Sequence, residues 1–540
     1  MIADPFREGI AAGWKTIDAA ALEGELRLEA DVVVVGSGAG GGVTAEILAQ
    51  AGLSVVIVEE GPLKSSADFR MREREAYPQL YQESAGRQTR DKAVTILQGR
   101  CVGGSTTVNW TSSFRTPPTT LAHWRAAHGI EGMGEADLAP WFARMEERLS
   151  IAPWPVPPNE NNDILRRGCE KLGIPAAAIR RNVKGCWNLG YCGMGCPTNA
   201  KQSMLVTTNP AALARGAVLV HRARLDRLVA SGERIVEAQA RGVAGSGSPP
   251  GAHLVRLVAR HFVLAAGAIG SPAVLLRSRL PDPGDLVGRR TFLHPTVVSA
   301  ALMPAPVKGY EGAPQTIYSD HFLDSVPVDG PVGFKLEAPP LHPILAGITL
   351  PGHGAGHAKW MKEFANLQVV IALLRDGFHP ESPGGRVRLR DDGSPELDYP
   401  IGAFLQEGLR RAYLAMAEVQ FAAGASTVMP LHEDAGPART WAAAKAAIAD
   451  LSMAPLHPRV VSAHVMGGCP MGKDAGRAVV DERGRHHHLA NLSVHDGSLF
   501  PTSIGANPQL SIYAVAARLA GALARDLGGK AATPPGGARS

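Results

Sequence analysis

A strand, a glycine-rich turn, a helix and a second strand follow one another between Asp31 and Glu59, and this order constrains the fold more than any other feature. Residues 32–35 are all valine, which is typical of a buried parallel strand. The glycines that follow have the spacing that lets a backbone turn sharply and approach a pyrophosphate; they are Gly36, Gly38 and Gly41. Glu59 ends the second apolar run about twenty residues later, where an acid can bind a ribose hydroxyl. The segment predicts a dinucleotide-binding βαβ unit, with FAD and NAD both open at this point.

A chain of 540 residues is long enough for two domains. A second glycine-rich turn at 98–110 and a strand running into a turn at 262–272 read as further parts of the cofactor sheet, whereas 301–450 contains short alternating strands. We therefore predict an α/β fold in which a Rossmann-like cofactor domain is joined by a discontinuous substrate domain on a mixed or antiparallel sheet. The expected segments are 1–115, 205–300 and 455–530 for the cofactor domain, 116–204 and 301–454 for the substrate or cap domain, and 531–540 for a disordered tail.

The charge pattern argues against a nucleic-acid partner. The formal net charge is +5, and the basic residues are scattered among acids instead of forming a block. The longest apolar stretch, 262–276, is interrupted by glycine, serine and proline, so no membrane span is expected. Because the first thirty residues contain six acids and no continuous apolar run, we expect no secretory signal and a cytoplasmic location, with export through a partner left open.

Four separated segments resemble the glucose-methanol-choline (GMC) oxidoreductases, which use FAD to oxidise alcohols. They are residues 36–59, 99–109, 265–278 and 464–507, so the resemblance spans nearly the entire chain. It implies an FAD-dependent alcohol oxidase or dehydrogenase, with a Rossmann-like FAD-binding domain. The motifs around His464 and Asn507 look most like the branch that contains cholesterol oxidases and long-chain alcohol oxidases. That branch implies a hydrophobic substrate, namely a long-chain, terpenoid or sterol-like alcohol, with oxygen or an electron-acceptor protein or quinone as the acceptor.

The same resemblance implies which residues contact the cofactor. The expected FAD-binding residues are Gly36, Gly38, Gly41, Glu59, Gly103, Gly104, Asn109, Ala266, Asp496, Gly497 and Pro508. Members of the family that attach the flavin covalently have a histidine immediately before the position of Asn109. Val108 stands there in this chain, so we expect noncovalent FAD.

His464 and Asn507 are the expected catalytic residues. Oxidation of a carbinol requires a base for the hydroxyl proton, a polar group that holds the oxygen, and flavin N5 as the hydride acceptor. A histidine can be neutral at working pH and accept the proton, and an asparagine amide can hold the alkoxide without competing for that proton. The two residues lie 43 positions apart (507 minus 464), so their convergence is implied by the resemblance and not by local spacing.

Three of the six cysteines, Cys186, Cys192 and Cys196, crowd into one glycine-rich segment. Thiolates in such a segment can ligate iron and sulfide, and the spacing resembles that of bacterial FAD-dependent sugar dehydrogenases, which carry a three-iron cluster. One alternative function is therefore an FAD and iron-sulfur dehydrogenase subunit, with a [3Fe-4S] cluster that passes electrons to a cytochrome. The other interpretation is that these thiols pack or border the active site. A third possibility, from another class, is a noncatalytic flavin-binding electron carrier.

The other histidines are weaker candidates. We interpret His294 as structural, and His457 as either lining the cavity or packing. The run 486–488 is expected to form a solvated loop.

Overall fold

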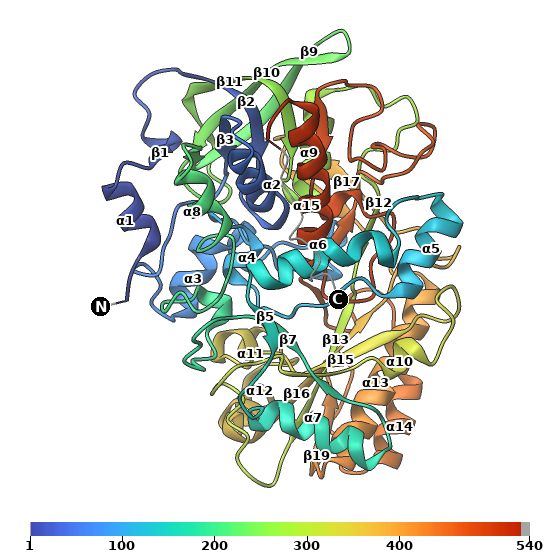
Figure 1. Ribbon diagram of the computed structural model, residues 1–540. Helices are drawn as coiled ribbons and strands as arrows, with labels where there is room; N and C mark the ends of the chain where they lie inside the picture. Colours follow the sequence, from blue (N-terminus) through green and yellow to red (C-terminus); the bar gives the residue numbers. More distant parts are fainter. Residues whose placement is uncertain (1, 531–540) are drawn as a thin grey trace, which may run out of the picture.

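The computed structural model describes residues 2–530, and its first sheet is built around the predicted βαβ unit (Figure 1). Strand β2 (Leu26–Val35) pairs in parallel with β3 (Val55–Val58), and α2 (Ala39–Gln50) connects them. The four valines divide between two cores, Val33 and Val35 facing one and Val32 and Val34 the other. Because both faces of the sheet are covered in this way, the strand reads as a continuous apolar run and not as an alternating one.

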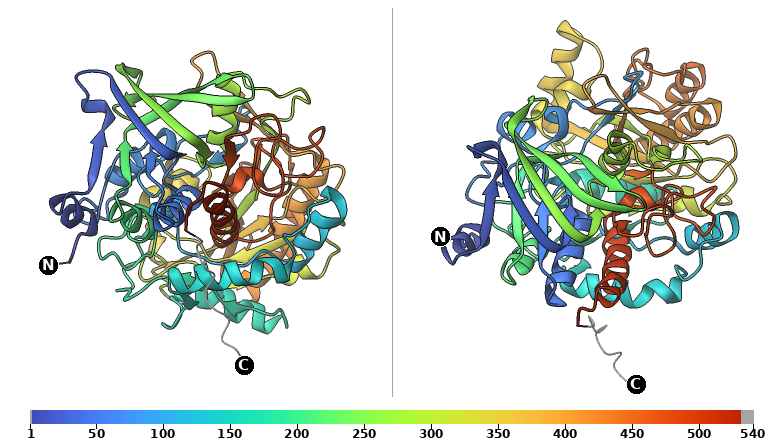
Figure 2. Two further views of the ribbon diagram at one scale, coloured as in Figure 1. Left: turned by 45° about the horizontal axis from the view of Figure 1, so that its top comes forward. Right: turned by 90° about the horizontal axis from the view of Figure 1, so that it is seen from above.

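This first sheet has eight strands. Its remaining members are β1 (Lys15–Asp18), β8 (Val218–His221), β9 (Ala223–Ser231), β10 (Arg234–Val243), β11 (Pro250–Leu264) and β22 (Leu492–Val494). Strand β11 pairs in parallel with both β2 and β22, so the first, middle and last parts of the chain lie side by side, as both views of Figure 2 show. Strands β9, β10 and β11 form an antiparallel extension of the parallel part. On the faces of the sheet, α15 (Gln509–Asp526) packs against α2, and α9 (Gly267–Ser278) packs against β9.

A second eight-stranded sheet occupies the lower half of the molecule in Figure 1. Its strands are β4 (Val94–Ile96), β20 (Val460–Ser462), β13 (Thr296–Leu302), β16 (Leu367–Leu374), β15 (Phe334–Glu337), β14 (Ile317–Ser319), β6 (Ala177–Ala178) and β19 (Thr427–Pro430). The pairings are antiparallel except that of β20 with β4. The long helix α13 (Ala403–Ala422) packs against β13, β16 and β19, and covers one face. The predicted α/β fold, with a Rossmann-like domain and a mixed second sheet, is confirmed.

Two smaller sheets and the remaining helices complete the described chain. The four-stranded sheet contains β18 (Pro395–Asp398), β17 (Gly385–Leu389), β12 (Arg289–Leu293) and β21 (Val465–Gly467), and β5 (Ile151–Pro153) pairs with β7 (Arg180–Asn182). The helices are α1 (Pro5–Ala11), α3 (Glu73–Leu80), α4 (Ser105–Val108), α5 (Pro118–His128), α6 (Glu135–Arg148), α7 (Glu160–Lys171), α8 (Thr208–Leu213), α10 (His321–Asp324), α11 (Pro343–Thr349), α12 (Gly354–Lys362) and α14 (Trp441–Asp450).

The domain boundaries remain a proposal. Every strand of the first sheet comes from the segments 1–115, 205–300 and 455–530. The second sheet, however, also draws β4, β20 and most of β13 from those segments, so it is not confined to the proposed substrate domain. The expected disordered tail, 531–540, lies outside the described residues.

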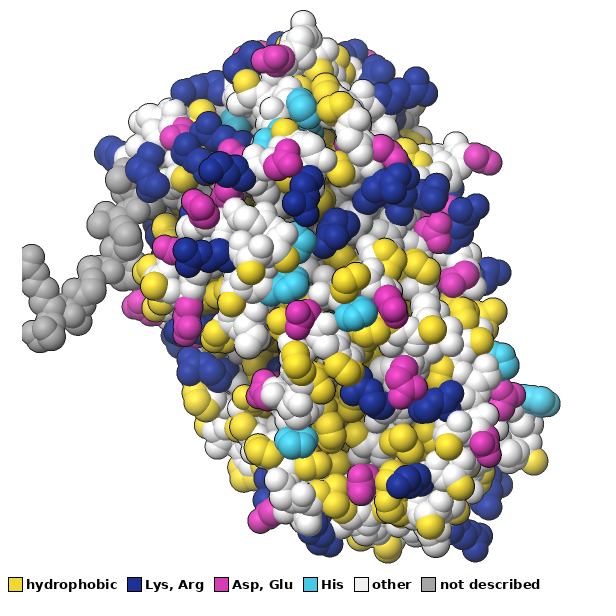
Figure 3. Space-filling model, turned by 90° about the vertical axis from the view of Figure 1, so that its right-hand side faces the viewer, with side chains coloured by type: hydrophobic (Ala, Val, Ile, Leu, Met, Phe, Trp, Pro, Cys, Tyr) yellow, Lys and Arg dark blue, Asp and Glu magenta, His cyan; other side chains and the backbone are white. Residues whose placement is uncertain are grey.

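Among the described residues, none of the helices combines the length and the apolar character needed to cross a bilayer. On the face drawn in Figure 3, basic side chains lie among acidic ones.

Candidate active site

A cavity of about 920 Å³ is lined by residues of both large sheets. Val35 and Val58, at the ends of β2 and β3, lie on one side, and Val298 and Ile371 of β13 and β16 lie on the other. Parallel sheets commonly bind ligands at the carboxyl ends of their strands, and this cavity begins there. All of the predicted FAD-binding and catalytic residues except Gly41 and Gly103 line it, whereas Cys186, Cys192 and Cys196 do not.

The two glycine-rich turns contact each other at the edge of this cavity. Gly36 has a φ of +102°, and a Cβ there would lie 2.3 Å from the carbonyl oxygen of Ala265. Gly104 has a φ of +54°, and a Cβ there would lie 2.9 Å from Cα of Gly38. Side chains are thus excluded where the two turns meet. Bare backbone at the start of a helix is the arrangement that receives a pyrophosphate, so these residues fit FAD.

Gly41 and Gly103 do not line the cavity, but they hold the two turns in place. A Cβ on Gly41 would lie 1.8 Å from the carbonyl oxygen of Gly36, so only glycine lets α2 approach the turn this closely. The N–H of Gly103 donates to Oγ of Ser37 at 2.9 Å, which ties the second turn to the first.

Glu59 orders the first turn. Its Oε2 accepts hydrogen bonds from the N–H and the hydroxyl of Ser37 at 3.0 and 2.6 Å, and its Oε1 accepts from the N–H of Gly61 at 2.8 Å. Burial raises the pKa of Glu59, while these donors act in the opposite direction. A carboxylate has further lone pairs, so Glu59 can also accept from a ribose hydroxyl.

Asp496 connects the C-terminal part of the chain to the start of α9. Its Oδ2 accepts from the N–H of Gly267 at 2.8 Å and from the hydroxyl of Ser271 at 2.5 Å. Ala266 directly precedes α9, and Gly497 follows Asp496; both line the cavity. Burial raises the pKa of Asp496, opposed by these hydrogen bonds.

Asn109 is fixed on both sides by residues that the sequence did not single out. Its Nδ2 donates to Oε1 of Gln509 at 2.7 Å, and Gln509 begins α15 immediately after Pro508. Nζ of Lys201 donates to the carbonyl oxygens of Asn109 and Cys192 at 2.9 and 2.8 Å. Lys201 is buried, and burial lowers its pKa to about 8. The backbone that borders the expected isoalloxazine site is therefore anchored by a buried ammonium group.

His464 lies in the cavity wall and contacts a second histidine. Its Nδ1 lies 3.0 Å from Nδ1 of His294, and Nε2 of His294 accepts the N–H of Gly505 at 3.2 Å. With Nε2 accepting, neutral His294 carries its proton on Nδ1 and donates it to His464. Burial, and after it the charge of Lys335, lower the pKa of His464 to about 3, so the imidazole is neutral near pH 7.

Asn507 contacts a buried carboxyl group. Its Nδ2 lies 3.4 Å from Oε2 of Glu337, which also accepts from Nε2 of Gln315 at 2.7 Å. Glu337 is fully buried behind Asn507, and burial raises its pKa to about 7, with Lys335 the strongest opposing influence. Oδ1 of Asn507 is buried without a hydrogen-bond partner within the described residues. This is the kind of unpaired polar atom that a bound ligand satisfies.

The cavity continues along an apolar wall. Successive side chains along β13 and along β16 point to opposite faces of the sheet, so one set packs under α13 and the other faces the cavity. The cavity-facing residues are Val298, Ala300, Leu367, Val369, Ile371 and Leu373. Antiparallel pairing places Val298 beside Ile371 and Ala300 beside Val369. Across the cavity, α11 contributes Leu345, Ala346 and Thr349. An apolar chain laid along this wall would lead to His464 and Asn507.

Several residues in or directly behind the cavity wall were not identified from the sequence. Glu337 lies in an alternating strand, Phe-Lys-Leu-Glu, whose period shows that it shares a face with Lys335 but does not reveal which face meets the site. His294 was interpreted as structural, yet it contacts His464. The low-complexity stretch 245–250 also lines the cavity.

The cysteine segment does not form a compact ligand set. Cys186, Cys192 and Cys196 are partly exposed and free. Nη2 of the buried Arg181 lies 3.7 Å from Sγ of Cys192. Within residues 2–530, the side chains whose metal-binding atoms lie within 4.8 Å of one another are His432, Asp434 and His457. The three thiols do not form such a group.

Two expectations about other histidines need correction. His457 does not line the cavity; its side chain is 43% exposed and contacts Asp434. The run 486–488 is not a fully solvated loop, because His486 is only 5% exposed and its backbone pairs with Val480 and Leu492.

Comparisons with known proteins identify the family and the cofactor. Residues 76–296 and 380–516 match the two sequence profiles described as GMC oxidoreductase, and residues 31–70 match an FAD binding domain. An uncharacterized GMC-type oxidoreductase of Sinorhizobium fredii is 30% identical over 92% of this chain and 95% of its own length. A long-chain-alcohol oxidase of Arabidopsis thaliana is 28% identical over 91% of this chain and 68% of its own length.

Solved structures give the same fold. Pyridoxine 4-oxidase from Mesorbium loti superposes with a TM-score of 0.63 at 19% identity, covering 91% of this chain and 98% of the other. The comparisons support FAD as the cofactor and do not support the iron-sulfur cluster.

Proposed function

Since this chain belongs to the GMC oxidoreductase family and is an FAD-dependent alcohol oxidase or dehydrogenase, we propose that its substrate is a hydrophobic alcohol, which it converts to an aldehyde or ketone. The observation that carries this proposal is the apolar wall of β13 and β16, which leads from the outer part of the cavity to His464 and Asn507. Each buried methylene of a substrate contributes about 0.8 kcal/mol, so such a wall favours long-chain, terpenoid or sterol-like alcohols over small polar ones.

FAD, when bound, supplies N5 as the acceptor of the hydride from the carbinol carbon. Its proposed ligands are the two glycine turns with Glu59 and Asp496, and the segment around Asn109 for the flavin ring. Val108 lacks a nucleophilic ring nitrogen, which supports noncovalent attachment. Precipitation of the yellow protein in acid tests this point: the colour is expected in the supernatant, and colour that stays in the pellet would contradict it.

His464 is the proposed base for the hydroxyl proton. Because Nδ1 of His464 faces His294, Nε2 is the ring nitrogen available to the alcohol. As a hydrogen-bond acceptor from His294, neutral His464 carries its own proton on Nε2 and would donate to the alcohol oxygen. Acting as a base at Nε2 requires the proton between the two rings to reside on His464. That shift places a proton on Nε2 of His294 and breaks the hydrogen bond that the N–H of Gly505 donates to this nitrogen, which costs about 1–3 kcal/mol.

Asn507 is proposed to hold the alcohol oxygen through the Nδ2 hydrogen that is not directed at Glu337, and Glu337 is proposed to orient its amide. Glu337 does not line the cavity, so it acts on the substrate only through Asn507. Protonated below its pKa of about 7, Glu337 adds no negative charge behind a developing alkoxide.

The acceptor is proposed to be oxygen or an electron-acceptor protein or quinone. An anaerobic panel of alcohols tests the activity, because substrates bleach the flavin absorbance. Admission of air then separates an oxidase, which reoxidises rapidly and releases peroxide, from a dehydrogenase. A protein whose flavin no alcohol bleaches would instead be the electron carrier.

A further inference from the structure

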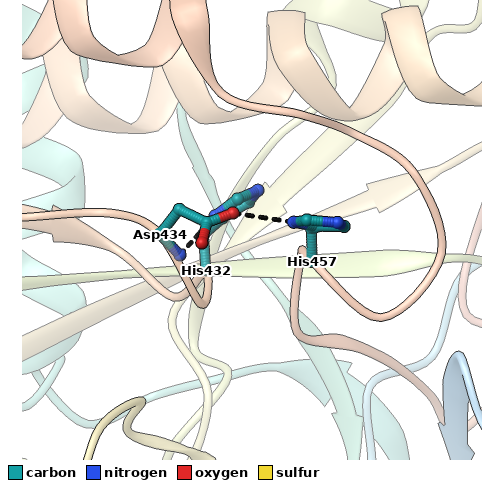
Figure 4. A group of neighbouring side chains, drawn as sticks. All are labelled: His432, Asp434 and His457. Atoms are coloured by element: carbon teal, nitrogen blue, oxygen red, sulfur yellow. Dashed lines mark hydrogen bonds and ion pairs between the residues drawn. The ribbon is translucent and has the colours of Figure 1, made fainter.

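Outside the cavity, the described residues contain one compact group of metal-ligand side chains. His432, Asp434 and His457 place a donor atom each within 4.8 Å of the others, and Figure 4 shows the carboxylate of Asp434 bonded to the ring of His457. None of the three lines the active-site cavity. They come from two loops, one following β19 and the other preceding β20.

The buried member of this group has the arrangement of a metal ligand. His432 is fully buried, and its Nε2 lies 2.7 Å from the carbonyl oxygen of Ser452. A carbonyl only accepts, so the ring carries its proton on Nε2 and keeps a lone pair on Nδ1. Metal-binding histidines are typically fixed in this way by a carbonyl on the opposite ring nitrogen. Nδ1 points toward Asp434 and accepts its backbone N–H at 3.1 Å.

The other two members are free to adjust. Nδ1 of His457 lies 2.7 Å from Oδ2 of Asp434, and the two side chains are 43% and 59% exposed. Two atoms bound to one tetrahedral zinc ion lie about 3.3 Å apart, given zinc–ligand distances of about 2.0–2.1 Å. The exposed pair therefore needs to open by well under 1 Å. The distances to His432 need to close by at most about 1.5 Å, since all three donor atoms lie within 4.8 Å of one another. Rotations of the two partly exposed side chains supply both changes.

We propose that His432, Asp434 and His457 bind one zinc ion through two imidazole nitrogens and one carboxylate oxygen, with water in the remaining position. Two nitrogens and one oxygen suit a borderline cation such as Zn²⁺ better than calcium or magnesium, which prefer all-oxygen sites. Binding replaces the hydrogen bond from the Asp434 N–H to His432 and the contact between Asp434 and His457.

The location assigns this site a structural role. Leu431, next to His432, lines the substrate cavity, and its carbonyl oxygen accepts the N–H of Arg459 at 3.0 Å. Arg459 leads into β20, and β20 leads to His464. The zinc ion would thus join two loops directly behind the cavity wall and fix the strand that delivers the catalytic histidine, without touching substrate or cofactor.

Calorimetric titration of the FAD-loaded, EDTA-treated full chain with zinc chloride tests the proposal. We expect one tight equivalent in the wild type, weakened by more than about 10-fold in His457→Ala and in Asp434→Asn, since loss even of second-sphere partners costs about 10- to 100-fold. His488→Ala is the control, because it removes a histidine from the unrelated 486–488 run, and it should leave the tight equivalent unchanged.

X-ray absorption at the zinc edge of the one-equivalent complex identifies the ligands. We expect nitrogen and oxygen scatterers at about 2.0–2.1 Å and none at the zinc–sulfur distance of about 2.3 Å. A sulfur shell, which would place the ion at the cysteines, overturns the proposal. So does the absence of a tight equivalent in the wild type, or unchanged affinity in both ligand variants.

Discussion

The apolar wall makes a specific prediction about the substitution Val369→Thr. Val369 and Val370 are neighbours on β16, but Val369 lines the cavity whereas Val370 packs in the core beneath α13. Threonine has nearly the shape of valine, so the exchange introduces a hydroxyl group with little change in volume. Val369 is 6% exposed and lines the cavity, so a hydroxyl there can contact water in the cavity and loses that contact when an alkyl chain covers it.

The expected size follows from the desolvation of that hydroxyl. Burial of an unpaired hydroxyl costs about 1–3 kcal/mol in proteins. Since 1.4 kcal/mol corresponds to a factor of ten, kcat/KM of Val369→Thr for a long alcohol such as decanol should fall about 5- to 140-fold. The loss for propanol, which is too short to cover the wall, should be less than about 2-fold on the same scale.

Val370→Thr is the matched control. There the hydroxyl is buried on folding, so the free energy of unfolding should fall by about 1–3 kcal/mol while the ratio of decanol to propanol activity stays unchanged. Steady-state kinetics with both alcohols, and urea unfolding of both variants, measure the two effects. Equal losses for short and long alcohols in Val369→Thr, or a changed preference in Val370→Thr, would refute the assignment of this wall to the substrate.

Three further predictions concern the polar end of the cavity and the cofactor turns. His464→Ala should bind FAD normally yet lower the anaerobic rate of flavin reduction by about 10²- to 10⁴-fold, the usual contribution of a general base; a wild-type rate in stopped-flow absorbance would contradict the role. The pKa of Glu337 is raised to about 7 in the folded protein, so as the pH rises the unfolded chain loses this proton before the folded protein does, and the stability that Glu337 contributes is full below about pH 4.5 and is lost as the pH rises toward 7. The free energy of unfolding of Glu337→Gln, measured in urea, should therefore fall less steeply with pH than that of the wild type over this range. Parallel plots of unfolding free energy against pH for the two proteins would exclude the raised pKa. Gly104→Ala should weaken FAD binding in a fluorescence titration because its Cβ would lie 2.9 Å from Gly38, whereas Gly402→Ala, with open space around it, should bind FAD like the wild type.

Local patterns in the sequence predict the structure of the cofactor site only for its first glycine-rich turn. The valines, glycines and Glu59 lie within thirty residues, and neighbours in sequence are also neighbours in the βαβ unit. The hydrogen bonds from Ser37 to Glu59 were not foreseen, because a serine between two glycines has no distinguishing signal.

The catalytic end of the cavity could not be derived in this way. His294 and His464 meet through the pairing of β12 with β21, and Asn507 meets Glu337 where the loop before α15 contacts the end of β15. A family resemblance supplied His464 and Asn507. It did not supply Glu337 or His294, whose significance comes from contacts with those two residues and not from motifs of their own.

Reduction of the bound flavin under anaerobic conditions tests the central claim most directly. When the wild-type enzyme is mixed with decanol, the flavin absorbance should bleach, and deuterium at the carbinol carbon should slow the bleaching, because the hydride leaves that carbon. Flavin that remains fully oxidised with every alcohol tried, or bleaching that His464→Ala and Asn507→Ala leave unchanged, would contradict the account.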